Sequence, residues 1–300
     1  MSKRISALLL CLFLFCLLIV FPAAGCGQNS SSGSGEEPPV FSPLNVLVPE
    51  APGTDTIGYS PLILDISNIS QGYLTAVSDS NGTTKNIQLS ADDGVVYSYF
   101  VSSGESAVIP FTSGSDTYQI SCYEQVNGSH YAALFAQALE VSLENEFLPF
   151  LYPNQYVNFT PDSEACKLAL SLLAEDATEQ ESIDTVFQYV TQHVTYDEDK
   201  AATVETGYLP DIDETLSTGK GICFDYAALM TAMLRSRDIP CKLQIGYAGD
   251  IKHAWIDVYI RGKGWVEQAI TYDGEKWNRM DPTFTCLLYT SDAADEARSV

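Results

Sequence analysis

The sequence predicts an α+β protein, in which an all-β region is followed by helices packed on an antiparallel sheet. Short runs of β-branched and aromatic residues, separated by turn residues, fill residues 45–147. From about residue 158 the apolar residues recur at helical spacing, and strand-like alternation returns after Pro240. We therefore expect two domains, 45–147 and 158–285, in this chain of 300 residues.

The first 25 residues have the pattern of a lipoprotein signal peptide. Lys3 and Arg4 precede an apolar run at 7–21, which is shorter than the roughly 20 residues that comfortably span a bilayer. The small residues that follow resemble a bacterial lipobox, which implies that Cys26 is lipidated and anchors the protein on the extracytoplasmic face of the cell membrane. An ordinary secretory signal and an uncleaved anchor are the alternatives.

Residues 26–44 are rich in Ser, Gly, Glu and Pro and predict a disordered tether. The region 45–147 predicts an antiparallel sandwich of about seven strands, since its strand-length runs alternate with turn signals. No catalytic set is visible in this region, and His130 is expected to be a strand residue. The expected strands lie at 44–48, 62–66, 73–77, 94–101, 107–111, 117–123 and 132–143.

Two helices are expected after residue 158. Asp162 or Ser163 can cap the first of them. Thr178 or Glu179 opens the second, whose apolar residues recur at helical spacing.

A cysteine at the start of a buried helix is the central feature of the second domain. Gly219 and Gly221 interrupt the pattern just before a run without helix breakers from Cys223 to about Arg237, and that run is apolar nearly all round. The free N–H groups and the positive end of the helix dipole favour thiolate over thiol at such a position. Cys223 is therefore a candidate nucleophile, and the alternative is a small buried structural residue.

A nucleophilic thiol needs an imidazole to take its proton and a third group to orient that imidazole. His253 lies in the alternating segment 252–260, which predicts a strand. Asp281 precedes Pro282 at the end of the strands expected next. The candidate catalytic set is Cys223, His253 and Asp281.

Five motifs follow one another along the chain, at 219–227, 235–240, 253–255, 264–265 and 281–283. In this order they resemble the transglutaminase-like superfamily. The resemblance implies a papain-like core in which Cys223 is the nucleophile, His253 the general base and acid, and Asp281 the group that orients His253. The intervening residues 266–280 depart from the usual spacing, and an extra hairpin would explain them. That departure leaves Asp273 as a competitor for the role of Asp281.

Composition excludes several classes of partner. A net charge of −24 repels nucleic acid, and no basic patch interleaved with aromatic residues occurs. No zinc, P-loop or dinucleotide motif is present, so no metal and no cofactor are expected. Cys122, Cys166 and Cys241 lie in strand or apolar patterns and are expected to be structural, without a complete disulfide framework.

Residues 286–300 continue the chain without the pattern of a fold. They resemble the translation of a sequencing-library adapter, so we expect the natural protein to continue differently after Thr285.

The sequence favours an extracytoplasmic, membrane-anchored cysteine acyl-transfer enzyme, either a peptidase or a protein-glutamine transamidase. Its expected partner is a protein or peptide substrate, and its location makes the cell wall a plausible source. The backbone N–H of Cys223 is a candidate oxyanion donor. The alternative is a non-catalytic surface binding or scaffold lipoprotein that keeps a transglutaminase-like fold.

Overall fold

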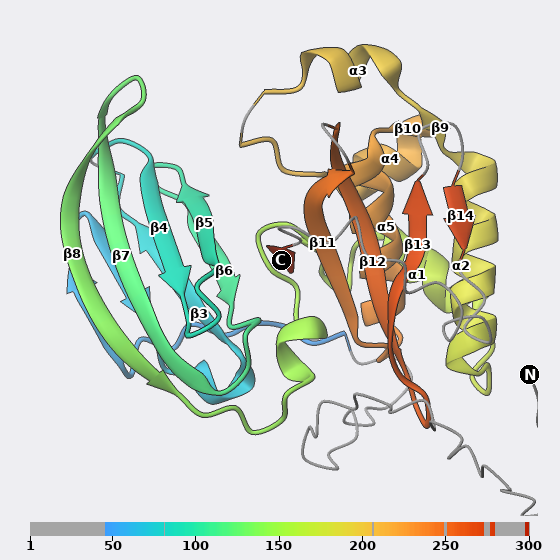
Figure 1. The fold of residues 1–300 in the computed structure, drawn as a ribbon, viewed down its shortest axis with the longest axis horizontal. Coiled ribbons are helices and arrows are strands. Elements are labelled where there is room, and N and C mark those ends of the chain that lie inside the picture. Colours follow the sequence, from blue (N-terminus) through green and yellow to red (C-terminus); the bar gives the residue numbers. More distant parts are fainter. Residues whose placement is uncertain are drawn as a thin grey trace, which may run out of the picture. The chain divides into compact units, whose positions relative to one another are not determined.

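The computed structural model describes residues 46–80, 82–205, 207–248, 251–272, 277–279 and 298–299. All of them belong to one compact unit, residues 36–300. The expected signal peptide, the tether and Cys26 lie outside the described residues. Strands dominate the first part of the described chain, and helices and a second antiparallel sheet form the rest, which confirms the α+β fold class (Figure 1).

Two four-stranded antiparallel sheets form the first part of the described chain. Their inward-facing side chains, such as Leu64 and Leu74 on one sheet and Ile87 and Ile120 on the other, are buried in the core. One sheet has the order β1 (Thr56–Tyr59), β2 (Leu62–Asp65), β3 (Tyr73–Ser78), β6 (Ser106–Pro110). The other has the order β5 (Val96–Val101), β4 (Lys85–Ser90), β7 (Asp116–Asn127), β8 (His130–Val141).

The prediction of a first strand at 44–48 is wrong for the residues of this range that the structure describes. Residues 46–50 form no strand, and the N–H of Glu50 donates instead to the hydroxyl of Tyr73 at 2.8 Å. A strand forms later, at β1, whose four residues are mostly exposed and include Gly58. His130 begins β8 and is exposed, as expected of a strand residue.

A linker that contains the 3₁₀ turn η2 (Leu148–Phe150) follows β8 and contacts the edge strand β5. Another 3₁₀ turn, η1 (Ile69–Gln71), lies before β3. The side-chain amide of Gln155 donates to the carbonyl of Phe100 at 2.5 Å and accepts from its N–H at 3.2 Å. The hydroxyl of Tyr156 donates to the carbonyl of Ser98 at 2.6 Å. The linker is therefore hydrogen-bonded along β5.

Five helices are described in the second part of the chain. Thr178 caps α2 with a capping box to Glu181, because their side chains bond reciprocally to each other's backbone N–H groups. Ser163 is the N-cap of α1. Both N-cap residues are among those expected, although the side chain of Ser163 makes no capping hydrogen bond. The helices are α1 (Glu164–Leu172), α2 (Glu179–His193), α3 (Glu198–Thr203), α4 (Ile212–Thr218) and α5 (Cys223–Arg235).

A five-stranded antiparallel sheet packs against α5 through β11 and β12. The antiparallel pair of β13 and β14 is the hairpin expected between the Gly-Trp and Asp-Pro-Thr motifs. The strand order is β14 (Trp277–Arg279), β13 (Gly264–Tyr272), β12 (Ile251–Ile260), β11 (Cys241–Ala248), β15 (Arg298–Ser299). A separate parallel pair joins β9 (Thr195–Tyr196) to β10 (Lys220–Gly221).

Arg235, at the end of α5, ties this helix to the sheet and to the linker. Its buried guanidinium donates to the carbonyl of Cys241 through two nitrogens, at 3.1 and 2.7 Å, and to that of Tyr152 at 2.9 Å. Burial lowers the pKa of Arg235 to about 10, so it stays charged at neutral pH. Three carbonyl contacts satisfy this buried cation.

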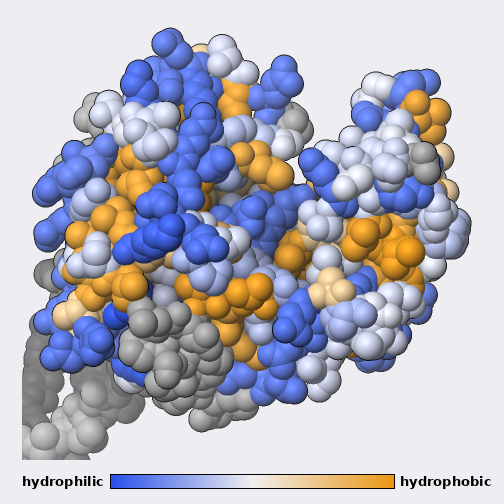
Figure 2. Space-filling view, turned by 180° about the vertical axis from the view of Figure 1, so that it is seen from behind, coloured by the Kyte–Doolittle hydropathy of each residue, from blue (hydrophilic) through white to orange (hydrophobic). Residues whose placement is uncertain are grey.

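Hydrophilic residues cover much of the face shown in Figure 2, and hydrophobic patches lie between them. None of the helices within the described ranges is long and apolar enough to cross a membrane.

Candidate active site

Cys223 is the first residue of α5, and the chain before it explains why the helix starts there. Gly219 takes the left-handed conformation, with φ of 63°, and ends α4. The carboxylate of Asp225 accepts from the N–H of Ile222 at 2.8 Å and so caps α5. A Cβ on Gly221 would lie 2.7 Å from the Cβ of Asp225, so this turn requires glycine.

Asp225 is also the centre of a buried polar network. Its carboxylate accepts from the hydroxyl of Tyr208 at 2.6 Å and pairs with the ammonium of Lys200 at 2.8 Å. Lys200 also donates to the Tyr208 hydroxyl at 2.5 Å. Burial, together with the hydrogen bond to Asp225, raises the pKa of Tyr208 to about 12. The network therefore connects the loop between α3 and α4 to the start of α5.

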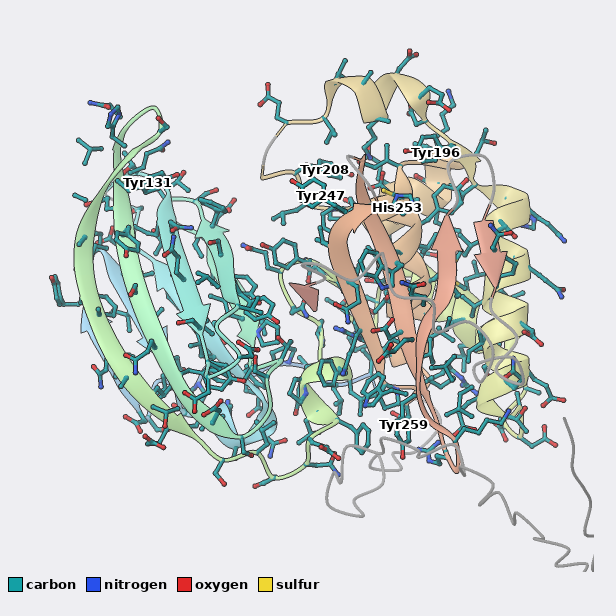
Figure 3. The ribbon with its side chains drawn as sticks, viewed as in Figure 1. Tyr131, Tyr196, Tyr208, Tyr247, His253 and Tyr259 are labelled. Carbon is teal, nitrogen blue, oxygen red and sulfur yellow. The ribbon has the colours of Figure 1, made fainter. Side chains whose placement is uncertain are left out.

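Cys223 and His253 line one cavity of about 340 Å³. His253 lies on β12 opposite Gly246 of β11. The helix α5 that begins at Cys223 packs against β12, the strand that carries His253. Figure 3 shows His253 at one end of β12, with Tyr196, Tyr208 and Tyr247 around it.

The thiol is less acidic than its place in the helix predicted. Burial raises the pKa of Cys223, although the backbone N–H groups of Ala254 and Phe224 act in the opposite direction. The donors expected at the helix start are present, but desolvation of the thiolate outweighs them. The thiol therefore keeps its proton at neutral pH unless a base removes it, which is the role predicted for His253.

The remaining sequence predictions concern two aspartates, a metal ion and three further cysteines. Asp281 and its competitor Asp273 are outside the described residues, so the third member of the triad stays a prediction. The described part of the chain holds no cluster of three or more His, Cys, Asp or Glu residues suited to a metal ion. Cys122, Cys166 and Cys241 are free and buried.

The sequence analysis assigned no role to Asp225, Lys200 or Tyr208, although Asp225 lies in the motif at 219–227. The usable signal was the position of Asp225, three residues after Ile222, where an acidic side chain commonly caps a helix. Lys200 and Tyr208 carried no such local signal because they reach Asp225 from α3 and from the loop that follows it.

The α+β core therefore places a cysteine at a helix N-terminus and a histidine on a strand in one cavity. Residues 167–282 match the transglutaminase-like superfamily, and this domain of the chain belongs to that superfamily. None of the curated proteins compared with the chain matches it.

Two solved structures show weak similarity to the chain. A proposed cysteine protease from Cytophaga hutchinsonii has a TM-score of 0.36 and 16% identity, covering 65% of this chain and 72% of that one. A proposed protease from Parabacteroides distasonis has a TM-score of 0.29 and 12% identity, covering 69% of this chain and 62% of that one. The family assignment depends on the sequence match over residues 167–282.

Proposed function

We propose that the chain is a cysteine peptidase that hydrolyses peptide bonds through an acyl-enzyme on Cys223. The observation that carries the proposal is the shared cavity of Cys223 and His253 at the start of α5. Membership of the transglutaminase-like superfamily supports the same chemistry. The non-catalytic alternative assigns no role to this pairing of a thiol with an imidazole.

In the proposed reaction His253 takes the proton of the Cys223 thiol, and the thiolate attacks the carbonyl carbon of the scissile bond. The backbone N–H of Cys223 is the proposed donor to the resulting oxyanion. As the C–N bond breaks, the imidazolium returns its proton to the leaving amine, and a thioester remains. Water then attacks the thioester, passes a proton through His253 and releases the acid and the free thiol.

Asp281 is the proposed partner that orients the imidazole of His253. A transamidase would share every step up to the thioester and differ only in using an amine to resolve it. An added amine therefore separates the two reactions.

New amino termini in a complex peptide mixture measure the proposed activity. We expect the wild-type chain to generate them and Cys223→Ala to lose about 10³-fold or more, because the nucleophile is gone. Mass spectrometry of amine-blocked peptides, with a dansylated alkylamine added, records both cleavage and amine incorporation at glutamine. Amine incorporation without cleavage would show a transamidase in place of a peptidase. The absence of both products would contradict the acyl-transfer proposal.

The variants Asp281→Asn and Asp273→Asn test which aspartate orients the imidazole of His253. We expect about a 10²- to 10⁴-fold loss of cleavage with Asp281→Asn, because the imidazole loses its oriented tautomer. Asp273→Asn should leave the rate close to wild type. A larger loss of cleavage with Asp273→Asn than with Asp281→Asn would assign the orienting role to Asp273.

We also propose that Cys26 is lipidated and holds the enzyme on the outer side of the cell membrane. Expressed in a bacterial host, the wild-type chain is expected in the membrane fraction and Cys26→Ser outside it, because acyl chains provide the anchoring energy. Metabolic labelling with an alkyne fatty acid should mark only the chain with Cys26. Equal membrane retention and no label on either chain would contradict the anchor.

A further inference from the structure

One wall of the cavity of Cys223 comes from α3 and the loop that follows it. Ala201 and Val204 line this wall with Tyr208, and Val204 is 38% exposed although its side chain is apolar. We call Ala201, Val204 and Tyr208 the α3 wall. The other aliphatic and phenylalanine side chains of the lining come from the start of α5 and from two strands of the sheet, and they are Ile222, Phe224, Ile245 and Ala254. The space beside the candidate nucleophile is therefore mainly apolar.

The charges at this cavity disfavour an acidic ligand. Glu205 is the one carboxylate in the described part of the lining, and no lysine or arginine is found among those residues. A second carboxylate in the cavity would therefore be repelled without a described cation to pair with it. Glu205 is itself exposed, so an ion pair with a basic ligand would contribute little. An uncharged apolar group fits this lining best.

The Asp225 network fixes the α3 wall in place. Lys200 of α3 pairs with Asp225 at 2.8 Å, and its ammonium lies 4.5 Å from the centroid of the Tyr208 ring. The carboxylate of Asp197 accepts from the N–H of Lys200 at 2.9 Å and caps α3. The N–H of Val204 donates to the carbonyl of Lys200 at 2.8 Å. The cavity is therefore preformed, so the binding of a ligand requires little ordering of this wall.

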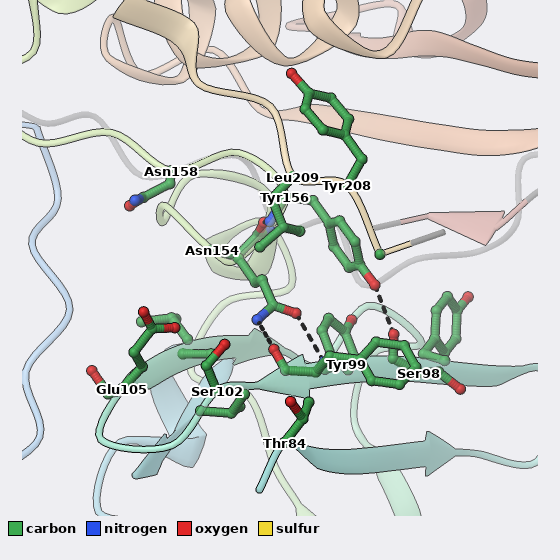
Figure 4. Close-up of a pocket in the computed structure, with 18 of the residues that line it drawn as sticks. Thr84, Ser98, Tyr99, Ser102, Glu105, Asn154, Tyr156, Asn158, Tyr208 and Leu209 are labelled. Carbon is green, nitrogen blue, oxygen red and sulfur yellow. Dashed lines mark hydrogen bonds between the residues drawn. The ribbon is translucent and has the colours of Figure 1, made fainter. Parts of the chain in front are cut away.

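The size of the cavity limits what it can hold. Its volume of about 340 Å³ is near the lower end of the range, roughly 300–1,000 Å³, of small-molecule sites. Tyr208 also borders a larger cavity of about 1370 Å³, where Figure 4 shows it with Leu209. The smaller cavity therefore has room for a reacting carbonyl and about one side chain, and Tyr208 bounds it on the side of the larger one.

We infer that the α3 wall determines specificity, and that it selects an uncharged apolar side chain next to the bond that Cys223 attacks. An aliphatic side chain of about the size of leucine buries its surface against Ala201 and Val204, whereas an acidic one loses its hydration beside Glu205. The inferred substrate class is a protein segment with an aliphatic residue at the cleavage site. This inference rests on the proposed function for the reaction that follows binding.

Alkylation of Cys223 with three iodoacetamides that carry tails of similar length tests the inference. The tails end in a methyl group, a carboxylate or an ammonium group, and plain iodoacetamide is the reference for each chain. In the folded chain we expect the methyl-ended reagent to react about tenfold or more faster than the carboxylate-ended one, relative to their rates with the urea-unfolded chain. Peptide mass spectrometry after timed alkylation measures the rates.

Two variants change the α3 wall. Val204→Lys should reduce the preference for the methyl-ended over the carboxylate-ended reagent about tenfold, because it supplies a cation. Ala201→Leu should slow the methyl-ended reagent about tenfold relative to plain iodoacetamide, because the new side chain fills the cavity. The matched control is Val126→Lys, which changes an exposed valine of β7 outside the cavity lining and should keep the parent's preference. Thermal midpoints identify the variants that fold, and either wall variant that folds suffices for the test.

The same preference in the folded and the unfolded chain would overturn the inference, and so would wall variants that label like Val126→Lys. Fastest labelling by the ammonium-ended reagent would also overturn it, because specificity would then be basic and depend on Glu205. The proposed function is judged separately, since alkylation requires no cleavage. An apolar preference without any peptide cleavage would overturn only the proposed function, and cleavage without apolar residues beside the new termini would overturn only the inferred specificity.

Discussion

Cys223 is expected to react with iodoacetamide before any other described cysteine at neutral pH, and His253→Ala should slow this reaction by about tenfold or more. Burial raises the pKa of the Cys223 thiol, so the reactive thiolate at neutral pH depends on proton transfer to a nearby base. His253 lines the same cavity and is the proposed base.

The pH dependence of Cys223 alkylation shows the direction in which His253 changes the reactivity of the thiol. With His253 as proton acceptor, labelling of Cys223 should begin below the ordinary thiol pKa of about 8.5. In His253→Ala only the raised pKa remains, so labelling should move to alkaline pH. Peptide mass spectrometry after timed alkylation between about pH 5 and pH 10 provides both profiles.

The other three free cysteines are internal controls. Burial raises the pKa of Cys122 to about 12 and that of Cys166 to about 11, and it also raises that of Cys241. All three should label only after urea unfolding, at rates similar to that of Cys223 in the unfolded chain. If native Cys223 labels no faster than these thiols, or if His253→Ala leaves its profile unchanged, the proposed catalytic pair is wrong.

Asp225→Asn is expected to destabilise the folded chain by about 3 kcal/mol, because it removes the charge from a fully buried carboxylate that pairs with Lys200. The new amide NH₂ would face the donors of Lys200 or Tyr208 and leave buried polar groups unsatisfied. Since Asp225 also caps α5, Cys223 should lose its selective labelling even where the chain remains folded. Urea unfolding measures the free-energy change.

Glu164→Gln is the matched control, because it neutralises a carboxylate whose salt bridge to Lys167 is exposed to solvent. This change should cost no more than about 0.5 kcal/mol. Equal losses for the two variants would show that the Asp225 network adds nothing beyond a surface ion pair. Unchanged Cys223 labelling in folded Asp225→Asn would separate the network from the placement of the thiol.

Local sequence signals predicted the elements that carry the two central residues. The glycines before Cys223 and the breaker-free apolar run after it mark the start of α5, and alternation around His253 marks β12. The family motifs supplied the order of these elements, and order alone was enough to expect Cys223 and His253 in one cavity.

Features that depend on contacts between distant segments were not predicted. The acidity of Cys223 was inferred from its helix alone, whereas burial by other elements decides the direction of its pKa shift. A cavity of about 1370 Å³ combines residues such as Phe100 and Tyr247, which lie far apart in sequence. β1 was missed because a short exposed edge strand has little apolar alternation to detect.

The side-chain amide of Gln155 affects the association of one copy of this protein with another. Unpaired groups on an edge strand are templates for joining a second molecule, and β5 is such an edge. Gln155 engages both backbone groups of Phe100, and Tyr156 engages the carbonyl of Ser98. Two side chains thus shield this margin from intermolecular association, so that at Phe100 and Ser98 the molecule resists aggregation without a further strand.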